Sequence, residues 1–124
     1  MRIPVPDQDR LLDAAMDRSP CDLCVTNVRY VNVFTGEIYP ASVYVLDGFV
    51  VFVDKDDAQP AAHRPVQTVD GKGRFLVPGL IDSHVHIESS MLTPRHFAAV
   101  VLPRGVTSII HDPHELANVY GEAG

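Results

Sequence analysis

The chain has 124 residues, a net charge of -6, and 46% hydrophobic against 21% charged side chains, a composition typical of a globular protein with one modest domain. Its lysines and arginines are scattered, which argues against nucleic acid or an anionic membrane surface as the main partner. No apolar run approaches the ~20 residues that a membrane-spanning helix needs. The polar N-terminus, MRIPVPDQDR, also differs from a secretory signal peptide. We therefore expect a cytoplasmic protein that binds neither nucleic acid nor membrane.

The two cysteines, Cys21 and Cys24, form a C-x-x-C motif preceded by Pro20. Together with His86-Ile87-Glu88 this motif matches the two halves of a known zinc-binding signature, but in the reverse order. The sequence around the motif alternates like a strand, whereas a ligating C-x-x-C usually opens a helix. We expect Cys24 to be a small buried apolar residue and Cys21 to have no special role.

Residues 1–21 are expected to form an N-terminal segment that contains one short helix. The sequence DQDRLLDAAMDR, residues 7–18, carries acidic side chains in its first turn, where they interact favourably with the helix dipole. The apolar residues of this stretch are spaced as one stripe of a helix: Leu11, Leu12, Ala15 and Met16.

Residues 22–77 alternate with the period of two that is typical of strands. One or two strands cover CDLCVTNVRYVNVF, a turn follows at Thr35-Gly36, and Asp47-Gly48 between alternating apolar runs predicts a hairpin. We expect a loop over DDAQPAAHRP, with His63 in solvent, and then a further strand pair joined through Asp70-Gly71. The predicted domain is a small antiparallel sheet or part of a β-sandwich.

Residues 78–124 predict an alternation of strand and helix. GLIDSHVHI is dense in apolar residues, as parallel strands buried on both faces tend to be. Thr93 suits a helix N-cap and Pro94 the first helical position, Gly105 closes that helix, and VTSII is a second strand. Asp112-Pro113-His114-Glu115 has the pattern of a capping box at the start of another helix. This region is one βαβ unit, and the fold class is α/β.

His84 and His86 lie at the end of the first of these strands. Side chains at positions i and i+2 share a face, so the two rings project together, and Asp82 lies on the same face. In an α/β barrel this face is the interior, and the carboxyl end of the strand is where chemistry takes place. Two neighbouring neutral imidazoles are good ligands for zinc, manganese or iron, and Asp82 can orient one of them from behind. The alternative is a pair of core histidines bonded to backbone carbonyls.

The stretch PGLIDSHVHIESS resembles the first barrel strand of the amidohydrolase superfamily, whose mark is His-x-His after Pro-Gly-x-x-Asp. Further segments, VTNVRYVNVFTGEI, HIESSMLTP, FAAVVLPRGVTSII and HDPHELANVYG, together resemble the N-terminal part of a bacterial-type adenine deaminase. The resemblance extends over nearly the whole chain, from Leu11 to Gly121. The His-x-His motif alone identifies only the superfamily, whereas HIESS and HDPHE are the specific parts.

This resemblance implies a β-sandwich-like part followed by the first βαβ unit of a truncated (β/α)8 (TIM) barrel. It implies hydrolytic deamination of adenine to hypoxanthine and ammonia in purine salvage, at a binuclear centre of manganese or iron, with zinc as a further option. His84 and His86 are the implied metal ligands. A barrel takes about 250 residues, so the chain is expected to be an N-terminal fragment of a homo-oligomeric parent, with the remaining metal ligands on later strands.

Glu88 follows the two histidines and has two interpretations. In related enzymes such as dihydroorotase, the family pattern HxHxR places an arginine there that binds a substrate carboxylate. A glutamate would repel such a substrate and accept hydrogen bonds from a ring N–H or an exocyclic amine instead, which favours a nucleobase. The second interpretation is a loop carboxylate that bonds the amides of Ser89 and Ser90.

The second strand ends next to His111, Asp112, His114 and Glu115, which are expected on the same rim. Deamination needs a carboxylate to transfer a proton to the departing ammonia. Our candidates for this catalytic role are Glu88, Asp112 and Glu115, and our candidates for substrate contact are Glu88, Ser89 and His114.

Two other functions are compatible with parts of the pattern. Another cyclic amidohydrolase, dihydroorotase-like or deacetylase-like, would share the His-x-His motif. A small module that binds a divalent metal, or pairs with another chain through open strand edges, would need no catalysis. We expect the 124-residue chain alone to be inactive, because two histidines do not complete a metal centre. His96 is expected to be a surface or packing residue.

Overall fold

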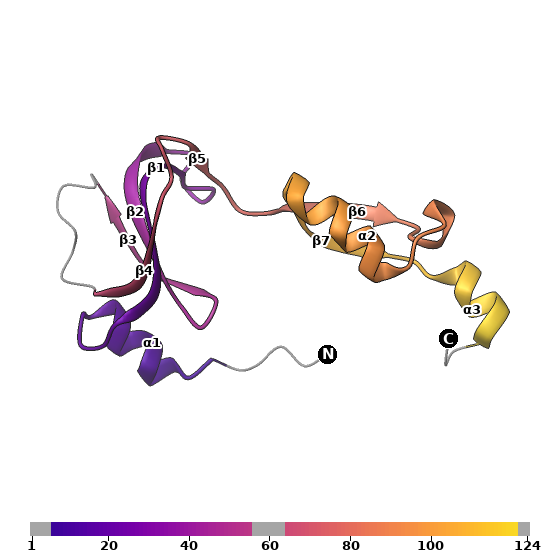
Figure 1. Ribbon diagram of the computed structural model, residues 1–124, viewed down its shortest axis with the longest axis horizontal. Helices are drawn as coiled ribbons and strands as arrows, with labels where there is room; N and C mark the ends of the chain where they lie inside the picture. Colours follow the sequence, from indigo (N-terminus) through magenta and orange to yellow (C-terminus); the bar gives the residue numbers. More distant parts are fainter. Residues whose placement is uncertain (1–5, 56–63, 122–124) are drawn as a thin grey trace. The chain divides into compact units, whose positions relative to one another are not determined.

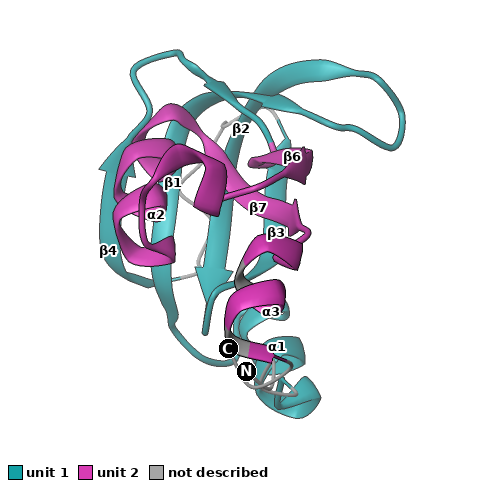
Figure 2. Cartoon of the chain, turned by 90° about the vertical axis from the view of Figure 1, so that its right-hand side faces the viewer, with its two compact units in different colours: residues 1–77 teal, residues 78–124 magenta. Residues whose placement is uncertain are grey.

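The computed structural model describes residues 6–55 and 64–121. The contacts divide the chain into two compact units, residues 1–77 and 78–124 (Figures 1 and 2). The first unit holds a helix and a five-stranded sheet, and the second holds a two-stranded sheet with helices. The expected loop over residues 56–63, with His63, lies outside the described residues.

The first unit begins with helix α1, Gln8–Ala15. Its N-cap is Asp7, whose side chain accepts a hydrogen bond from the backbone N–H of Arg10 at 3.2 Å. Such a bond satisfies one of the free N–H groups of the first turn. A helix is therefore present within the predicted residues 7–18, but it ends at Ala15, and Ala14 is its buried residue. The predicted apolar stripe is wrong in part, because Leu12 and Met16 are exposed.

The sheet of this unit has the strand order β3-β2-β1-β4, and β5 also pairs with β1. Strand β1, Cys21–Val31, and strand β2, Ile38–Leu46, are antiparallel, and β2 pairs in the same way with β3, Phe49–Lys55. The loop between β1 and β2 closes with a hydrogen bond of 2.8 Å from Gly36 N–H to the carbonyl of Asn32. The turn expected at Thr35-Gly36 is present.

The turn between β2 and β3 contains Asp47 and Gly48, as predicted. Both residues have positive φ, 51° and 81°, which is the conformation that a two-residue type I′ hairpin needs. Asp47 tolerates it as a short polar residue and glycine without a Cβ. The carboxylate of Asp22 accepts the N–H of Asp47 at 2.8 Å and fastens the turn to β1.

The prediction of a strand pair joined through Asp70-Gly71 is wrong. Strand β4, Pro65–Asp70, and strand β5, Phe75–Leu76, do not pair with each other, because both lie parallel to β1. Between them a tight turn closes with a bond of 3.0 Å from Arg74 N–H to the Gly71 carbonyl. The chain then rejoins the same neighbouring strand, so the sheet is mixed rather than antiparallel.

In the described part of this unit there is one sheet, and no second sheet packs on it as a sandwich would require. Helix α1 contacts the sheet at β3 instead. The core that the two share consists of Ala14, Cys21, Cys24, Tyr44 and Leu46, with Leu11 and Val51 packed against it.

Cys21 and Cys24 are both buried, and they do not form a disulfide. Burial raises the pKa of the Cys21 thiol, and the neighbouring Cys24 adds to the effect. A thiol whose pKa is raised carries little thiolate near neutral pH, which is the form that reacts and binds metal. The expectation that Cys24 is a small buried apolar residue is confirmed.

The second unit begins with strand β6, Leu80–Val85, followed by a short turn of 3-10 helix at Glu88–Ser90 and helix α2, Pro94–Val101. Strand β7, Val106–His111, runs parallel to β6, so α2 connects two parallel strands. Thr93 caps α2 by accepting the backbone N–H of His96, and Pro94 is its first residue, as the sequence indicated. Gly105 closes the connection with a φ of 91°.

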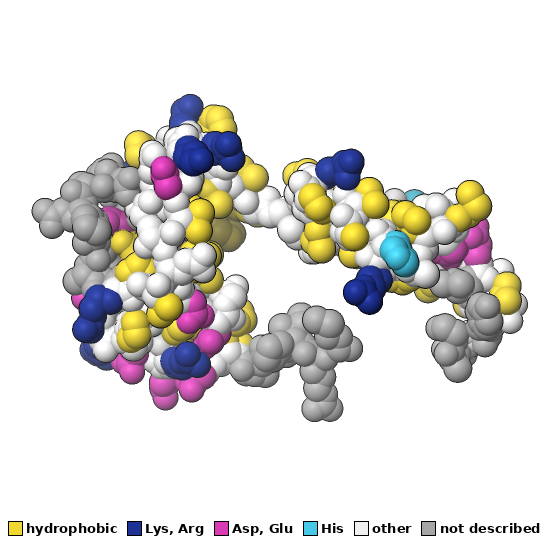
Figure 3. All heavy atoms as spheres, viewed as in Figure 1, with side chains coloured by type: hydrophobic (Ala, Val, Ile, Leu, Met, Phe, Trp, Pro, Cys, Tyr) yellow, Lys and Arg dark blue, Asp and Glu magenta, His cyan; other side chains and the backbone are white. Residues whose placement is uncertain are grey.

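The sheet of the second unit leaves much of its apolar surface uncovered. Among the described residues of this unit Ile87 is the one hydrophobic side chain that is fully buried, whereas Ile81 on β6 is 67% exposed and Ile110 on β7 is 61% exposed. Figure 3 shows hydrophobic side chains at the surface of this unit. Apolar surface of this kind is usually covered by a partner element.

Helix α3, His114–Tyr120, follows β7. The capping box expected at its start is absent: the N-cap is Pro113, and no side chain bonds a free N–H group there. The Asp112 carboxylate accepts from the ring of His114 instead. Over the described ranges of both units, no helix is long and apolar enough to cross a bilayer.

Candidate metal centre

His84 and His86 bring their rings together at the carboxyl end of β6. The two Nε2 atoms lie 3.0 Å apart, and the ring centroids are separated by 4.7 Å at a near-perpendicular angle of 81°. His84 belongs to the strand, and His86 lies one residue beyond its end. The alternation of strand side chains explains why the two rings point to the same side.

His86 is held in place by the backbone of the neighbouring strand. Its Nδ1 atom lies 2.9 Å from the carbonyl oxygen of Asp112, just after β7. Because a carbonyl only accepts, Nδ1 must carry the hydrogen, and Nε2 is left with a free lone pair. This is the usual arrangement of a metal-binding histidine, whose second nitrogen donates to a carbonyl or carboxylate.

The geometry of this histidine pair fits a metal ion. Two imidazole nitrogens bound to one tetrahedral metal at ~2.05 Å lie about 3.3 Å apart. The two Nε2 atoms are 3.0 Å apart, so a small separation of the rings brings both within bonding distance of one ion. A lone pair on His86 Nε2 that faces another ring nitrogen at this distance needs a proton or a cation between them. The donor set therefore suits a divalent metal.

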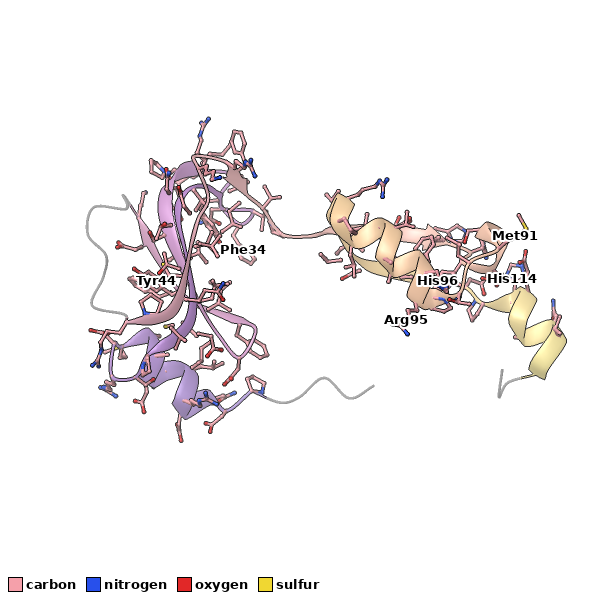
Figure 4. All side chains as sticks on the ribbon, in the orientation of Figure 1. Phe34, Tyr44, Met91, Arg95, His96 and His114 are labelled. Atoms are coloured by element: carbon pink, nitrogen blue, oxygen red, sulfur yellow. The ribbon has the colours of Figure 1, made fainter. Side chains whose placement is uncertain are left out.

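Asp112 and His114 extend this cluster from the second strand. His114 Nδ1 donates to the Asp112 carboxylate at 2.9 Å, and the rings of His86 and His114 are 4.8 Å apart. The ligand atoms of His86, Asp112 and His114 all lie within 4.8 Å of one another, and these three residues are a second set that could hold an ion. Figure 4 shows His114 at the start of α3.

The contact between these two residues shifts their protonation in opposite directions. The hydrogen bond from His114 lowers the pKa of Asp112, and the same bond raises the pKa of His114. Both side chains are exposed, so solvent weakens the interaction. The pair is thus a surface contact beside the two β6 histidines, with a carboxylate that stays ionised.

Ser89 and Glu115 connect the loop after β6 with helix α3. The Ser89 hydroxyl donates to the Glu115 carboxylate at 3.3 Å, across a sequence separation of 26 residues. Both side chains are exposed at the carboxyl ends of the two strands. The structure therefore brings Ser89, Asp112, His114 and Glu115 to one rim, as expected from the topology of parallel strands.

Glu88 is placed differently from the other rim residues. Its side chain is only 8% exposed, and neither carboxylate oxygen has a hydrogen-bond partner among the described residues. Oε2 lies 3.5 Å from Nε2 of His111. The expected bonds to the amides of Ser89 and Ser90 are not formed, because these would have given the oxygens partners.

Asp82 contacts His84 through the backbone and not through the ring. Its carboxylate accepts the His84 amide N–H at 3.2 Å. The group that orients a histidine ring is instead the Asp112 carbonyl, which sequence analysis did not identify. Backbone carbonyls carry no residue-specific signal, and only the pairing of Val85 with His111 brings this one close.

His96 lies on α2, is exposed, and is not one of the three residues grouped as possible metal ligands (Figure 4). Its Nδ1 atom is 2.8 Å from the hydroxyl of Thr93, the residue that caps the helix. This contact accounts for His96 as part of the helix start and agrees with the expected surface position.

Comparison with known proteins agrees with the geometry of the histidine pair. Residues 75–124 match the amidohydrolase family. Adenine deaminase of Paracoccus denitrificans is 50% identical over 118 residues, which are 94% of this chain and 20% of that protein. Adenine deaminase of Geobacillus kaustophilus is 46% identical over 90% of this chain and 18% of that protein. The chain thus spans about a fifth of the length of these curated relatives.

Solved structures give the same fold. L-hydantoinase (dihydropyrimidinase) from Arthrobacter aurescens superposes with a TM-score of 0.56 and 30% identity, over 75% of this chain and 21% of that one. N-acyl-D-glutamate deacylase from Bordetella bronchiseptica, complexed with zinc and a phosphonate inhibitor, superposes with a TM-score of 0.59 over 73% of this chain and 18% of that one. At 20% identity, the second likeness concerns the fold alone.

Residues 75–124 therefore match a segment of the amidohydrolase family, and the two parallel strands are consistent with part of a (β/α)8 barrel. Over more than 90% of its length, the chain is similar to a segment of curated adenine deaminases.

Proposed function

We propose that this chain is part of an enzyme that hydrolyses adenine to hypoxanthine and ammonia. The observation that carries the proposal is the identity of 50% with an adenine deaminase over 94% of the chain, in a segment that contains the histidine pair. L-hydantoinase is 30% identical. The higher identity favours adenine over the ring amides of other cyclic amidohydrolases.

In this proposal β6, α2 and β7 form the first βαβ unit of the barrel, and His84 and His86 are its first two metal ligands. The contact of 3.0 Å between their Nε2 atoms supports this assignment. Imidazole and carboxylate donors suit manganese, iron or zinc, and we assign a binuclear centre of manganese or iron. When bound, a divalent metal supplies the Lewis acidity that activates water for attack on the purine ring.

The other rim residues bind the purine and move the proton. The Asp112 carboxylate is a candidate for the proton transfer, in which it takes a proton from the attacking water and then gives it to the departing ammonia. Glu115 is a second candidate for this transfer. Ser89 and His114 offer a hydroxyl and a ring nitrogen on the same rim, and these can bond the edge of a nucleobase.

A barrel of typical size takes about 250 residues, so a complete centre needs strands and ligands that this chain does not supply. The remaining apolar faces of β6 and β7, with Ile81 and Ile110 exposed, support the packing of further strands beside them. We propose that the complete protein is a homo-oligomer, which light scattering after size-exclusion chromatography will test.

The test uses the full-length polypeptide that carries these residues. His84→Ala and His86→Ala should each lower adenine turnover by at least about 100-fold and reduce bound metal, since removal of even a supporting residue around a metal costs 10–100-fold. His96→Ala is the matched control, because His96 lies outside the cluster, and it should retain both. Full activity and full metal content in either histidine variant would contradict the assignment.

The 124-residue chain alone should not turn over adenine, whatever metal is supplied. Its described residues offer the two β6 histidines and the exposed Asp112–His114 contact, whereas a catalytic metal usually has three protein ligands and one open position. Ammonia release from adenine by the purified chain, above that of its His86→Ala variant, would refute this expectation.

A further inference from the structure

Glu88 and His111 form a nearly buried pair at the carboxyl ends of β6 and β7. The side chains are 8% and 21% exposed, and Glu88 Oε2 lies 3.5 Å from His111 Nε2. Neither oxygen of Glu88 has a hydrogen-bond partner in the described part of the chain. A buried carboxylate without a partner is costly, so the nearby imidazole is the group that must compensate it.

The other ring nitrogen of His111 faces the neighbouring strand. His111 Nδ1 lies 3.1 Å from the carbonyl oxygen of Val85 on β6, and this carbonyl also accepts the N–H of Asp112 at 3.4 Å. Nδ1 also lies 3.5 Å from the backbone nitrogen of Ile87. The contact with Val85 is the shorter one, and because a carbonyl only accepts, it requires the hydrogen on Nδ1. The imidazole thus contacts the Val85 carbonyl through Nδ1 and places Nε2 3.5 Å from the Glu88 carboxylate, across the ends of β7 and β6. A bond between Nε2 and the carboxylate needs one further proton, carried by either group.

The residue next to His111 completes the connection to the metal centre. The carbonyl of Asp112 accepts from Nδ1 of His86 at 2.9 Å and thereby leaves Nε2 of His86 free to bind metal. A rotation of the His111 side chain would leave the Asp112 peptide attached to Val85 only by its own N–H, at 3.4 Å, and would hold this carbonyl less firmly. Glu88 thus affects His86 through two contacts and one peptide bond.

The surroundings of Glu88 offer it no alternative partner. A cavity of 320 Å³ lies beside it, and apart from Thr93 and His111 its other walls are apolar: Ile87, Met91, Leu92 and Pro94. Both carboxylate oxygens are shielded from solvent, so a dissolved purine cannot reach them unless the turn at Glu88–Ser90 moves. The carboxylate is therefore directed at His111 and not at the rim.

We propose that Glu88 is a positioning residue, which acts through His111 to hold the Asp112 carbonyl that orients His86 for metal binding. The inference rests on the metal centre of the proposed function, but not on adenine as the substrate. It assigns Glu88 to the support of a ligand, in place of the substrate contact that its position in the sequence suggested.

The experiment measures the affinity of the metal-free, full-length polypeptide for Mn²⁺ by titration. Glu88→Ala and His111→Ala should each weaken binding about 10–100-fold, the usual effect of removing a group that orients a metal ligand. The double variant should be no weaker than the weaker single variant, because both residues act in one chain of contacts. The Michaelis constant for adenine should stay unchanged in Glu88→Ala, and kcat should fall at limiting metal.

Three further variants separate positioning from general damage. Glu88→Gln introduces an amide that can donate to His111 Nε2, so its metal affinity should be closer to that of the wild type than the affinity of Glu88→Ala is. Glu88→Asp keeps the charge but moves it away from His111, so its affinity for Mn²⁺ should also be reduced. This variant allows the test even if Glu88→Ala does not fold. Met91→Ala changes an exposed side chain of the same cavity and should bind Mn²⁺ normally.

Two results would overturn the inference. Normal Mn²⁺ affinity with a raised Michaelis constant in Glu88→Ala or Glu88→Asp would show a direct substrate contact. Additive losses in the double variant would show that Glu88 and His111 act independently. A wild-type protein that binds Mn²⁺ but does not deaminate adenine would refute the proposed function, and the affinities of the variants would still decide the role of Glu88.

Discussion

The two units of this chain divide stability and chemistry between them. In residues 1–77 the sheet and α1 bury a continuous core around Tyr44, and no cluster of possible metal ligands occurs among the residues described there. In residues 78–124 the possible ligands gather at the strand ends, and Ile87 is the one fully buried hydrophobic residue described. The unit that carries the reactive groups is thus the one that depends on further packing.

This contrast follows from the number of strands that flank each strand in its sheet. The β2 strand of the first unit buries four consecutive residues, Ala41 to Tyr44, because β1 and β3 flank it. The β6 strand of the second unit has one hydrogen-bonded neighbour, so Leu80 and Ile81 remain largely exposed although their sequence is that of a buried strand. Functional groups at strand ends need a rigid sheet, and here that sheet is incomplete.

The largest effect should come from the core of the first unit. Tyr44 is 2% exposed and packs on Phe52 at a ring separation of 6.0 Å. Tyr44→Ala should lower the free energy of unfolding by about 3–5 kcal/mol, as for other buried aromatic residues. Phe34→Ala is the control, because Phe34 is 93% exposed, and it should change stability by less than ~0.5 kcal/mol. Chemical denaturation measures both, and equal losses would contradict the assignment of the core.

A second effect in the same unit concerns a close contact of Gly71. A Cβ atom at this position would lie 2.3 Å from Cγ1 of Val28 on β1. Gly71→Ala should therefore destabilise the unit by about 1–3 kcal/mol through overpacking. Addition of Val28→Ala, which removes the clashing methyl group, should make the glycine substitution less costly. Strictly additive losses in denaturant titrations would show that this contact is not the cause.

In the second unit the corresponding test is the cap of α2. Thr93→Ala removes the acceptor for the His96 N–H and should cost about 1 kcal/mol of helix stability. Hydrogen exchange of the α2 amides should accelerate several-fold, whereas Thr93→Ser should retain the protection. If the amides of α2 exchange equally fast in the wild type and both variants, packing and not the cap stabilises the helix. The second unit would then depend less on further packing than we infer.

The smallest expected effect is a dependence of the stability of the first unit on pH. The Lys72 N–H and the Asn27 side chain donate to one oxygen of Asp70 at 2.8 and 2.9 Å, and these bonds lower the pKa of the carboxyl below 3.8. A lowered pKa in the folded state contributes stability above the unfolded value, which is lost as the pH falls through the folded value.

Asp70→Asn keeps the acceptor but not the charge, so its stability should fall less steeply than that of the wild type below pH 3.8. Asn27→Ala should lie between the two, because it removes one of the two donors. Thermal melts at several acidic pH values will show the slopes. Parallel slopes for the wild type and Asp70→Asn would contradict the assigned cause.

Local signals predicted local structure well. Asp47-Gly48 predicted its hairpin, and Thr93-Pro94 predicted the start of α2, because each depends on backbone conformation within a few residues. The pairing of β4 and β5 could not be predicted in this way. Its turn forms at Lys72 and Gly73, both with positive φ, but the choice of β1 as the common neighbour depends on contacts more than 40 residues away.

In the candidate site, too, contacts within one strand could be predicted and contacts between strands could not. The approach of His84 and His86 follows from strand alternation and was predicted. The contact of Glu88 with His111 was not, because it requires the register of β6 against β7, in which Val85 pairs with His111. The prediction of a capping box failed for a related reason. The ring of His114 occupies the Asp112 carboxylate, and the sequence motif alone does not show that the two side chains meet.

The position of β1 at the centre of its sheet also sets an order of folding. The turn at Asp47-Gly48 joins β2 and β3 directly, so that hairpin can form within microseconds. Strands β4 and β5 pair with β1, and their contacts close a segment of more than 40 residues, such as that from Asn27 to Asp70. Closure of such distant pairs slows folding. We expect β4 and β5 to dock last, so refolding of this unit should be limited by the arrival of its two parallel strands.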